Sequence, residues 1–279
     1  MRTITLITLA LTALTPVVAA DVPLVTDGQA RAVIVTPDAP LPVVQYAAEE
    51  LSYHVERATG VELPVVAEAG VPEAEAYVYL GATEAAEAAG IDVDALDFEE
   101  TVLRAGGNTL IIAGQDEDGD PLHNDTNAGT LWGVYELIER ELGVVWMWPG
   151  ERGTHVPPAA DVIIEETDER FEPWLLQRNI RAGNMKRGEP VTARFSDEAR
   201  ADYLRDQAVF LRRQRMGRNH ELRYGHAFNP WWDRYGDEHP EWFQLVNGER
   251  GPRSPGARFS MCVSDPGFHN RIIANWLEE

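Results

Sequence analysis

The sequence predicts an α/β protein: an N-terminal α+β domain with a mixed sheet and about three helices, then the first strand–helix units of a TIM-like (β/α)8 barrel. Short β-branched runs alternate with amphipathic helical periodicity as far as Glu165. After Asp168 arginine becomes frequent, and the elements follow the order β-α-β-β-α, which is typical of the beginning of a parallel barrel. Because only about 110 residues follow Asp168 and a complete barrel needs about 250, we expect an incomplete barrel in a truncated chain.

The first residues have the pattern of a secretory signal peptide. A short charged start, Met1-Arg2, precedes an apolar run that ends in Ala19-Ala20 before Asp21. The sequence therefore predicts a signal over residues 1–20 and an exported protein, periplasmic or extracellular. The apolar run is too short for a comfortable membrane span and no later stretch supplies one, so we expect no membrane span.

The charge of the chain restricts its partners. It carries 46 acidic and 24 basic residues, which gives a formal net charge of −22. This charge argues against nucleic acid or an anionic membrane as a partner, because phosphate binding requires a basic surface. Cys262 is the only cysteine, so the chain forms no internal disulfide and must be stabilised by its cores.

The expected first domain covers residues 21–168. Residues 32–36 predict a buried strand, and Pro42 opens a helix whose apolar residues recur at three- and four-residue steps until Gly60 ends it. A second amphipathic helix covers residues 129–142 and ends at Gly143. The other expected elements are strands at 63–66, 77–80, 144–148 and 162–165, a short helix at 84–89, and a hairpin formed by 101–104 and 109–113.

An acidic loop, residues 115–125, interrupts this domain. Asp116, Asp118 and Asp120 alternate, as in a calcium-binding loop. The glycine, Gly119, precedes the third aspartate, and no bidentate glutamate follows at the required distance. The pattern favours a solvated loop and leaves the calcium alternative open.

The second expected domain, residues 169–279, begins with a strand at 174–180. Ser196 then caps a helix over 197–216, with acidic residues in its first turn and arginines in its last, as the helix dipole favours. Further strands are expected before Gly225 and at 258–263. A final helix starts after Asp265, which is placed to cap it.

An aromatic segment, residues 218–245, contains three of the seven histidines and three of the eight tryptophans. It follows a predicted strand end, where loops commonly carry binding groups. An indole ring stacks on the C–H face of a sugar, while neighbouring polar groups bind its hydroxyls, so this composition suits a saccharide. The alternative is that the rings anchor the loop on the core, because large aromatic residues dominate core burial.

Three segments resemble known families. Residues 42–66 and 129–157 are similar to the N-terminal domain that precedes the catalytic barrel in family 67 α-glucuronidases and family 20 hexosaminidases. Residues 223–250 resemble the barrel start of secreted bacterial proteins of a domain-of-unknown-function family that carries this N-terminal module. The sharper motifs of that third segment are Gly225–Phe228 and His239–Phe243. The resemblance implies a barrel like that of glycoside hydrolases, with substrate at the C-terminal strand ends.

The function expected from these observations is a secreted carbohydrate-active protein, glycoside hydrolase-like and related to α-glucuronidases, acting on or binding polysaccharide-derived sugars. The alternative is a non-catalytic carbohydrate-binding or interaction protein. The resemblance implies catalytic carboxylates on later strands, so no residue of this chain is assigned that role. The expected partner is an oligosaccharide or polysaccharide, and the expected substrate-binding residues lie at predicted strand ends: Arg178, Asn179, Arg181, His226, Asn229, Trp231, Trp232 and Asp265.

A metal site is the third hypothesis. It would use His220, His226 and His239, but their spacing matches no compact zinc pattern and no cysteine cluster supports them. We therefore expect neither a metal nor a cofactor. For a substrate that carries a uronate, Arg178, Arg181 or Arg223 is the natural bidentate partner. The alternative is that such an arginine pairs with an acidic residue of the protein itself.

Overall fold

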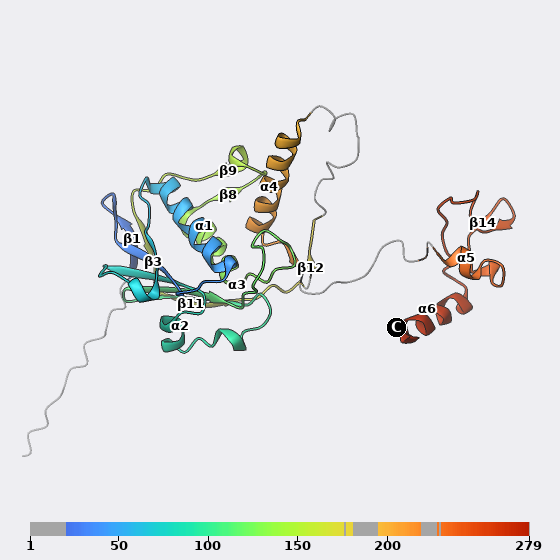
Figure 1. Cartoon of the computed structure of the whole chain (residues 1–279), viewed down its shortest axis with the longest axis horizontal. Coiled ribbons are helices and arrows are strands. Elements are labelled where there is room, and N and C mark those ends of the chain that lie inside the picture. Colours follow the sequence, from blue (N-terminus) through green and yellow to red (C-terminus); the bar gives the residue numbers. More distant parts are fainter. Residues whose placement is uncertain (1–20, 176, 181–194, 219–227, 229, 279) are drawn as a thin grey trace, which may run out of the picture. The chain divides into compact units, whose positions relative to one another are not determined.

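The computed structural model describes residues 21–175, 177–180, 195–218, 228 and 230–278 (Figure 1). The chain divides into two units, unit 1 within Met1–His220 and unit 2 within Glu221–Glu279. The predicted domain boundary near Asp168 falls inside unit 1 and stays a prediction about which segment folds alone. The predicted signal peptide, residues 1–20, lies outside the described residues.

Unit 1 is built on a six-stranded mixed sheet with the order β11-β6-β7-β5-β3-β4. β3 (Ala32–Thr36) pairs in parallel with β4 (Val65–Ala67) and β5 (Ala76–Leu80), and β5 pairs in parallel with β7 (Thr109–Gly114). β6 (Thr101–Gly106) is antiparallel to β7, which confirms the predicted hairpin, and β11 (Thr167–Phe171) is antiparallel to β6. The mixed sheet agrees with the expected α/β class.

Two smaller groups of strands in unit 1 precede β11 in the sequence. β1 (Val22–Thr26) pairs with β10 (Val162–Ile164) and with β2 (Gln29–Ala30). β8 (Val145–Trp146) and β9 (Thr154–His155) form a two-stranded hairpin. The predicted strand over residues 144–148 is therefore limited to two residues, and the chain turns away after Trp146.

Helices cover both faces of the six-stranded sheet (Figure 1). α1 (Pro42–Thr59) and α3 (Gly129–Leu142) pack on each other and on one face, in the larger apolar core, while α2 (Glu84–Ala88) packs on the other. Gly60 and Gly143 end α1 and α3 with φ values of 77° and 63°. This left-handed conformation favours glycine, so the predicted helix ends are confirmed.

α4 (Asp197–Arg213) also belongs to unit 1. The Ser196 hydroxyl accepts a hydrogen bond from the Ala199 amide at 3.1 Å, which confirms the predicted N-cap. The helix ends three residues before the predicted position 216, because Arg215 adopts a left-handed φ of 54°. The guanidinium of Arg212 is completely buried and lies 4.3 Å from the ring centre of Trp132 on α3.

Two of the strands expected to begin a parallel barrel, at 174–180 and 258–263, are not formed as predicted, and the strand expected before Gly225 lies outside the described residues. β12 (Gln177–Arg178) and β13 (Gly217–Arg218) make a two-residue antiparallel pair, and residues 258–263 contribute a single bridge from Met261 to Phe243. A strand persists only where neighbouring backbone satisfies its N–H and C=O groups, and these segments have few such neighbours. An incomplete barrel is thus not confirmed by the described residues.

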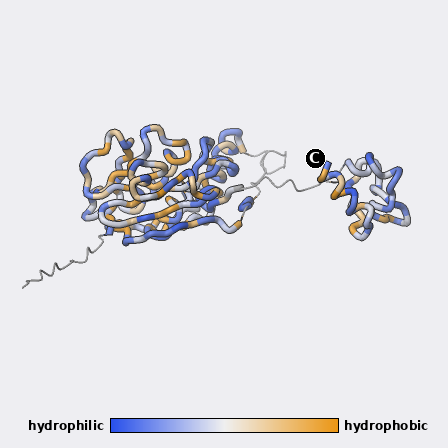
Figure 2. Tube along the Cα trace, turned by 90° about the horizontal axis from the view of Figure 1, so that it is seen from below, coloured by the Kyte–Doolittle hydropathy of each residue, from blue (hydrophilic) through white to orange (hydrophobic). Residues whose placement is uncertain are grey.

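Unit 2 has its own small core. α5 (Trp231–Tyr235), α6 (Pro266–Glu278) and the hairpin of β14 (Leu245–Val246) with β15 (Glu249–Arg250) are its elements. Its buried apolar residues are aromatic: Trp231, Trp242, Phe243 and Phe268. In both units polar and apolar stretches alternate along the chain (Figure 2), as is typical of helices and strands that bury one face and expose the other.

Short 3-10 turns connect several of these elements: Glu68–Gly70, Val93–Ala95, Glu151–Gly153 and Pro240–Trp242. Over the described residues, no helix combines the length and apolar character that a bilayer crossing requires.

Candidate functional site

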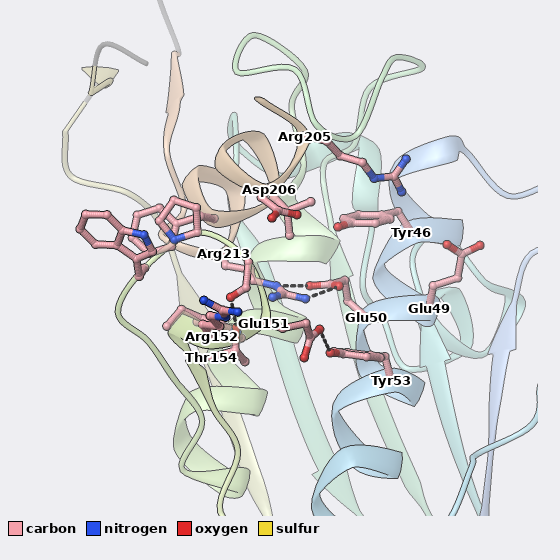
Figure 3. Close-up of a pocket in the computed structure, with 16 residues that line it drawn as sticks. Tyr46, Glu49, Glu50, Tyr53, Glu151, Arg152, Thr154, Arg205, Asp206 and Arg213 are labelled. Atoms are coloured by element: carbon pink, nitrogen blue, oxygen red, sulfur yellow. Dashed lines mark hydrogen bonds and ion pairs between the residues drawn. The ribbon is translucent and has the colours of Figure 1, made fainter. Parts of the chain in front are cut away.

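A cavity of about 690 Å³ opens in unit 1 between α1, the segment 146–154 and α4 (Figure 3). Its lining combines aromatic rings with charged groups of both signs. The lining residues are Tyr46, Glu49, Glu50, Tyr53, Trp146, Trp148, Pro149, Gly150, Glu151, Arg152, Thr154, Arg205, Asp206, Val209, Phe210 and Arg213. We refer to this space as the α1–α4 cavity.

A buried ion pair joins the two helices at the base of the α1–α4 cavity. Arg213 donates from Nε and Nη2 to the two carboxylate oxygens of Glu50, at 2.8 and 2.9 Å (Figure 3). The side chains are only 10% and 8% exposed. A bidentate, charge-assisted pair of this kind fixes geometry as well as charge, so it sets the spacing of α1 and α4.

His54 does not line the α1–α4 cavity but contacts two residues that do, Glu50 and Trp146. It is fully buried, and its Nδ1 lies 2.7 Å from the carbonyl oxygen of Glu50 while Trp146 Nε1 donates to its Nε2 at 3.2 Å. The two contacts together require a neutral ring with the proton on Nδ1. Burial lowers the pKa of His54 to about 4, which keeps it neutral at neutral pH.

One rim of the α1–α4 cavity is a second ion pair. Glu151 accepts hydrogen bonds from the Tyr53 hydroxyl and from Arg57, and the Arg57 guanidinium also donates to that hydroxyl at 3.0 Å. The hydrogen bond from Tyr53, followed by that from Arg57, lowers the pKa of Glu151. Glu151 is therefore held as a carboxylate rather than as a proton donor.

Three charged side chains and one indole ring of the α1–α4 cavity are open to a ligand. Trp148 is 66% exposed, and Arg152, Arg205 and Asp206 form no ion pair with another described residue. Figure 3 shows Arg205 beside the ring of Tyr46. An exposed indole next to guanidinium, carboxylate and hydroxyl groups provides a stacking surface and hydrogen-bonding groups of both kinds.

Sequence reasoning missed this site, although a signal was present. Tyr46, Glu49, Glu50 and Tyr53 recur at i, i+3, i+4 and i+7, so they form a polar stripe along one face of α1. Attention to the apolar face alone overlooks that stripe. In an extended strand Trp146 and Trp148 would face the same side; the structure instead buries Trp146 to 5% exposure and exposes Trp148.

The predicted site residues in unit 1 have structural partners. Arg178 donates to the buried carboxylate of Glu99 at 2.6 Å and to the carbonyl oxygens of Arg215 and Leu175. All three guanidinium nitrogens of Arg178 thus donate hydrogen bonds within the protein. Asn179 is exposed and accepts a hydrogen bond from Asn124 at 3.4 Å.

The predicted site residues in unit 2 lie in and around its aromatic core. Trp231 is 6% exposed, as the packing alternative expects, and Trp232 meets Phe243 edge to face at 4.9 Å. Asp265 accepts from the Phe268 amide at 3.1 Å, as expected of a helix cap. The other three predicted residues, Arg181, His226 and Asn229, lie outside the described residues, and a common site for the whole set stays a prediction.

The metal hypotheses find no cluster in the described part of the chain, where no three or more histidine, cysteine or acidic side chains gather. In the acidic loop, Asp116 is half-buried and accepts a hydrogen bond from the Thr130 amide at 3.0 Å, and desolvation raises its pKa to about 7. His239 stacks on Trp242 with ring centres 4.0 Å apart. His220 and His226 lie outside the described residues.

Comparison with known families gives one match. A family model described as a domain of unknown function (DUF4838) matches residues 148–279, which is less than half of the chain. Comparison with curated proteins gives no match.

Solved structures similar to the chain include glycoside hydrolases. A family GH115 4-O-methyl-α-glucuronidase with specificity for decorated arabinogalactans aligns over 53% of this chain and 18% of its own, at 22% identity and a TM-score of 0.35. The GH20 β-N-acetylhexosaminidase from Streptomyces coelicolor A3(2) aligns over 58% of this chain and 26% of its own, at 16% identity and a TM-score of 0.34.

The N-acetyl-β-hexosaminidase from Streptomyces plicatus in complex with Thio-NAglucal aligns over 91% of this chain and 52% of its own, at 11% identity and a TM-score of 0.38. In all three comparisons the aligned part is less than two thirds of the known enzyme.

Proposed function

We propose that this chain is a carbohydrate-active protein and that the α1–α4 cavity binds a saccharide. The observation that carries the proposal is the exposed indole of Trp148 at a cavity lined by arginine, carboxylate and tyrosine side chains. Stacking removes apolar surface of the sugar and the indole from water, which contributes about 25 cal/mol per Å². The charged and hydroxyl groups replace the water molecules bound to the sugar hydroxyls.

The size of the cavity fits this ligand class. About 690 Å³ lies within the usual range of small-molecule sites, roughly 300–1,000 Å³. If a bound sugar carries a uronate, the guanidinium groups of Arg152 and Arg205 are available for a charge-assisted contact.

For the reaction, we propose a glycoside hydrolase-like, α-glucuronidase-related activity on polysaccharide-derived sugars, following the resemblance of residues 42–66 and 129–157. Hydrolysis requires a carboxylic acid and a carboxylate on either side of the scissile bond. Two lining carboxylates, Glu50 and Glu151, form ion pairs with Arg213 and Arg57, so their oxygens are already bound within the protein. This engagement favours the second candidate, a cavity that binds sugar without cleaving it.

Replacement of Trp148 by alanine tests the binding site. We expect the affinity for oligosaccharides to fall about tenfold, equivalent to about 1.4 kcal/mol, as measured by calorimetry with xylotetraose, chitotetraose and a glucuronic-acid-bearing xylo-oligosaccharide. Trp174→Ala is the matched control, because Trp174 is 89% exposed and does not line the α1–α4 cavity.

Equal losses of affinity in the two variants, or no saccharide binding by the wild type, would refute the proposed site. Turnover of 4-nitrophenyl glycosides by the same protein separates the two candidates. Release of nitrophenol supports the hydrolase, whereas binding without release supports the non-catalytic protein.

A further inference from the structure

His54 is unusual among the groups near the α1–α4 cavity, because it touches the lining from behind without reaching the cavity itself. It is completely buried in α1, and both of its ring nitrogens are engaged. The Trp146 ring stands perpendicular to the imidazole, with ring centres 5.4 Å apart at 88°, and the Tyr53 ring lies at 4.9 Å and 89°. Two lining side chains are thus fixed against one imidazole.

The hydrogen bond from Trp146 is the contact most sensitive to a proton. Nε2 of His54 accepts it only while the imidazole is neutral; in the protonated ring both nitrogens are donors. The indole N–H and the new N–H would then point at each other, and the ring is fully buried. Protonation must therefore move Trp146, His54 or both.

The charged groups around His54 come from two helices. On α1 these are Glu50, whose charge favours protonation, and Arg57, whose charge opposes it, with the Tyr53 hydroxyl nearby. Arg213 on α4 opposes protonation and lies 5.8 Å from the ring centre of Trp146. Tyr135 on α3 packs on the other side of Trp146, at 5.4 Å.

We propose that neutral His54 is a positioning residue for the α1–α4 cavity: it holds Trp146 in place by accepting the hydrogen bond of the indole N–H. Protonation of His54 breaks this hydrogen bond, lets Trp146 move and weakens ligand binding. This inference rests on the proposed function, because it assigns a role to a residue behind the same cavity. His54 acts through Trp146 and Tyr53 and touches no ligand.

The direction of the pH dependence follows from the neutral form being the competent one. Burial lowers the pKa of His54 to about 4, so the competent form dominates above that pH and is lost as the pH falls through it. An apparent dissociation constant rises in proportion to the incompetent population, so half protonation weakens binding about twofold and nine-tenths protonation about tenfold.

The experiment measures the environment of Trp146 and the affinity for saccharide separately in the intact protein. The indole ¹H–¹⁵N signal of Trp146, assigned with Trp146→Phe, is recorded between pH 7 and pH 3.5, with circular dichroism to show that the fold is kept. Calorimetry over the same range uses whichever of xylotetraose, chitotetraose and the glucuronic-acid-bearing xylo-oligosaccharide binds most tightly at pH 6.

Two variants isolate the role of His54. In His54→Gln the amide oxygen still accepts the indole N–H but does not titrate, so we expect a constant Trp146 signal and about twofold less weakening at pH 4 than in the wild type. Any effect of pH on the other lining groups is common to both proteins and cancels in this comparison. His155→Gln is the matched control, because His155 is exposed on β9 and does not line the cavity.

A Trp146 signal that does not change between pH 7 and pH 3.5 in the folded wild type would overturn the inference without reference to any ligand. So would a signal that titrates while the saccharide affinity of the wild type and His54→Gln changes in parallel. If no saccharide binds at pH 6, the proposed function fails, and the indole titration alone still decides whether His54 holds Trp146.

Discussion

A buried ion pair, Glu50 with Arg213, fixes the position of α4 in unit 1. Glu50 and Arg213 are separated by 163 positions in the sequence, yet each satisfies the charge of the other in a nearly dry environment. Burying a charge without a partner costs several kcal/mol, whereas a bidentate pair recovers most of that cost. The pair is therefore a strong constraint on where α4 docks, although it is not a large net source of stability.

Removing one partner of this pair is expected to lower the free energy of unfolding. We expect Arg213→Leu to lower the free energy of unfolding by about 3 kcal/mol, because Glu50 is left buried and unpaired, and Glu50→Leu/Arg213→Leu to cost less than Arg213→Leu alone. Urea denaturation measures both. Arg200→Leu is the control, since the Arg200–Asp197 pair on α4 is exposed, and it is expected to cost at most about 0.5 kcal/mol. A double variant less stable than Arg213→Leu would contradict this account.

At the scale of elements, the distance between α3 and the sheet depends on a glycine inside the helix. A Cβ atom at Gly133 would lie 2.5 Å from Ile112 Cγ2 and 2.8 Å from Thr101 Oγ1, so β6 and β7 approach the helix backbone directly. Helix propensity favours alanine over glycine by about 1 kcal/mol. Overpacking of a core costs about 1–3 kcal/mol, and we expect this steric cost to exceed the gain in propensity.

Gly133→Ala is therefore expected to destabilise unit 1 by about 1 kcal/mol despite the better helix former, as measured by thermal or urea unfolding. Gly70→Ala is the control, because no atom lies within 4 Å of the added Cβ and the backbone there has no positive φ. A Gly133→Ala protein more stable than the wild type would show that the helix can move away from the sheet at little cost.

At the scale of the whole molecule, unit 1 includes the segments of the chain that follow the composition change at Asp168. β11 spans that position and pairs with β6. Arg178 binds the buried carboxylate of Glu99, and Arg213 binds Glu50. The first 168 residues thus contain the six-stranded sheet apart from part of its edge strand, but not the partners of two buried acids.

Two fragments compare the boundary predicted from composition with the extent of unit 1. We expect fragment 21–220 to unfold cooperatively and fragment 21–168 to be less stable by several kcal/mol, because Glu50 and Glu99 lose their guanidinium partners. Circular dichroism with urea denaturation measures the difference. Equal stability of the two fragments would support an independent domain that ends at Asp168, and it would mean that α4 does not stabilise unit 1.

The sequence by itself determined the elements whose signals are local. Helices α1 and α3, their glycine ends, the β6–β7 hairpin and the Ser196 cap follow from periodicity and turn chemistry within a few residues. The reduction of the expected strands at 174–180 and 258–263 to a two-residue strand and a single bridge could not be predicted in this way, because a strand depends on partners elsewhere in the chain.

Only the tertiary structure decided where the α1–α4 cavity lies. Its lining comes from α1, the segment 146–154 and α4, and pairs such as Glu50 with Arg213 or His54 with Trp146 join positions far apart in the sequence. The polar stripe of α1 was present in the sequence, but its partners were not identifiable from spacing. Local backbone preferences act over a few residues, whereas burial and pairing of charges depend on which distant segments the fold brings together.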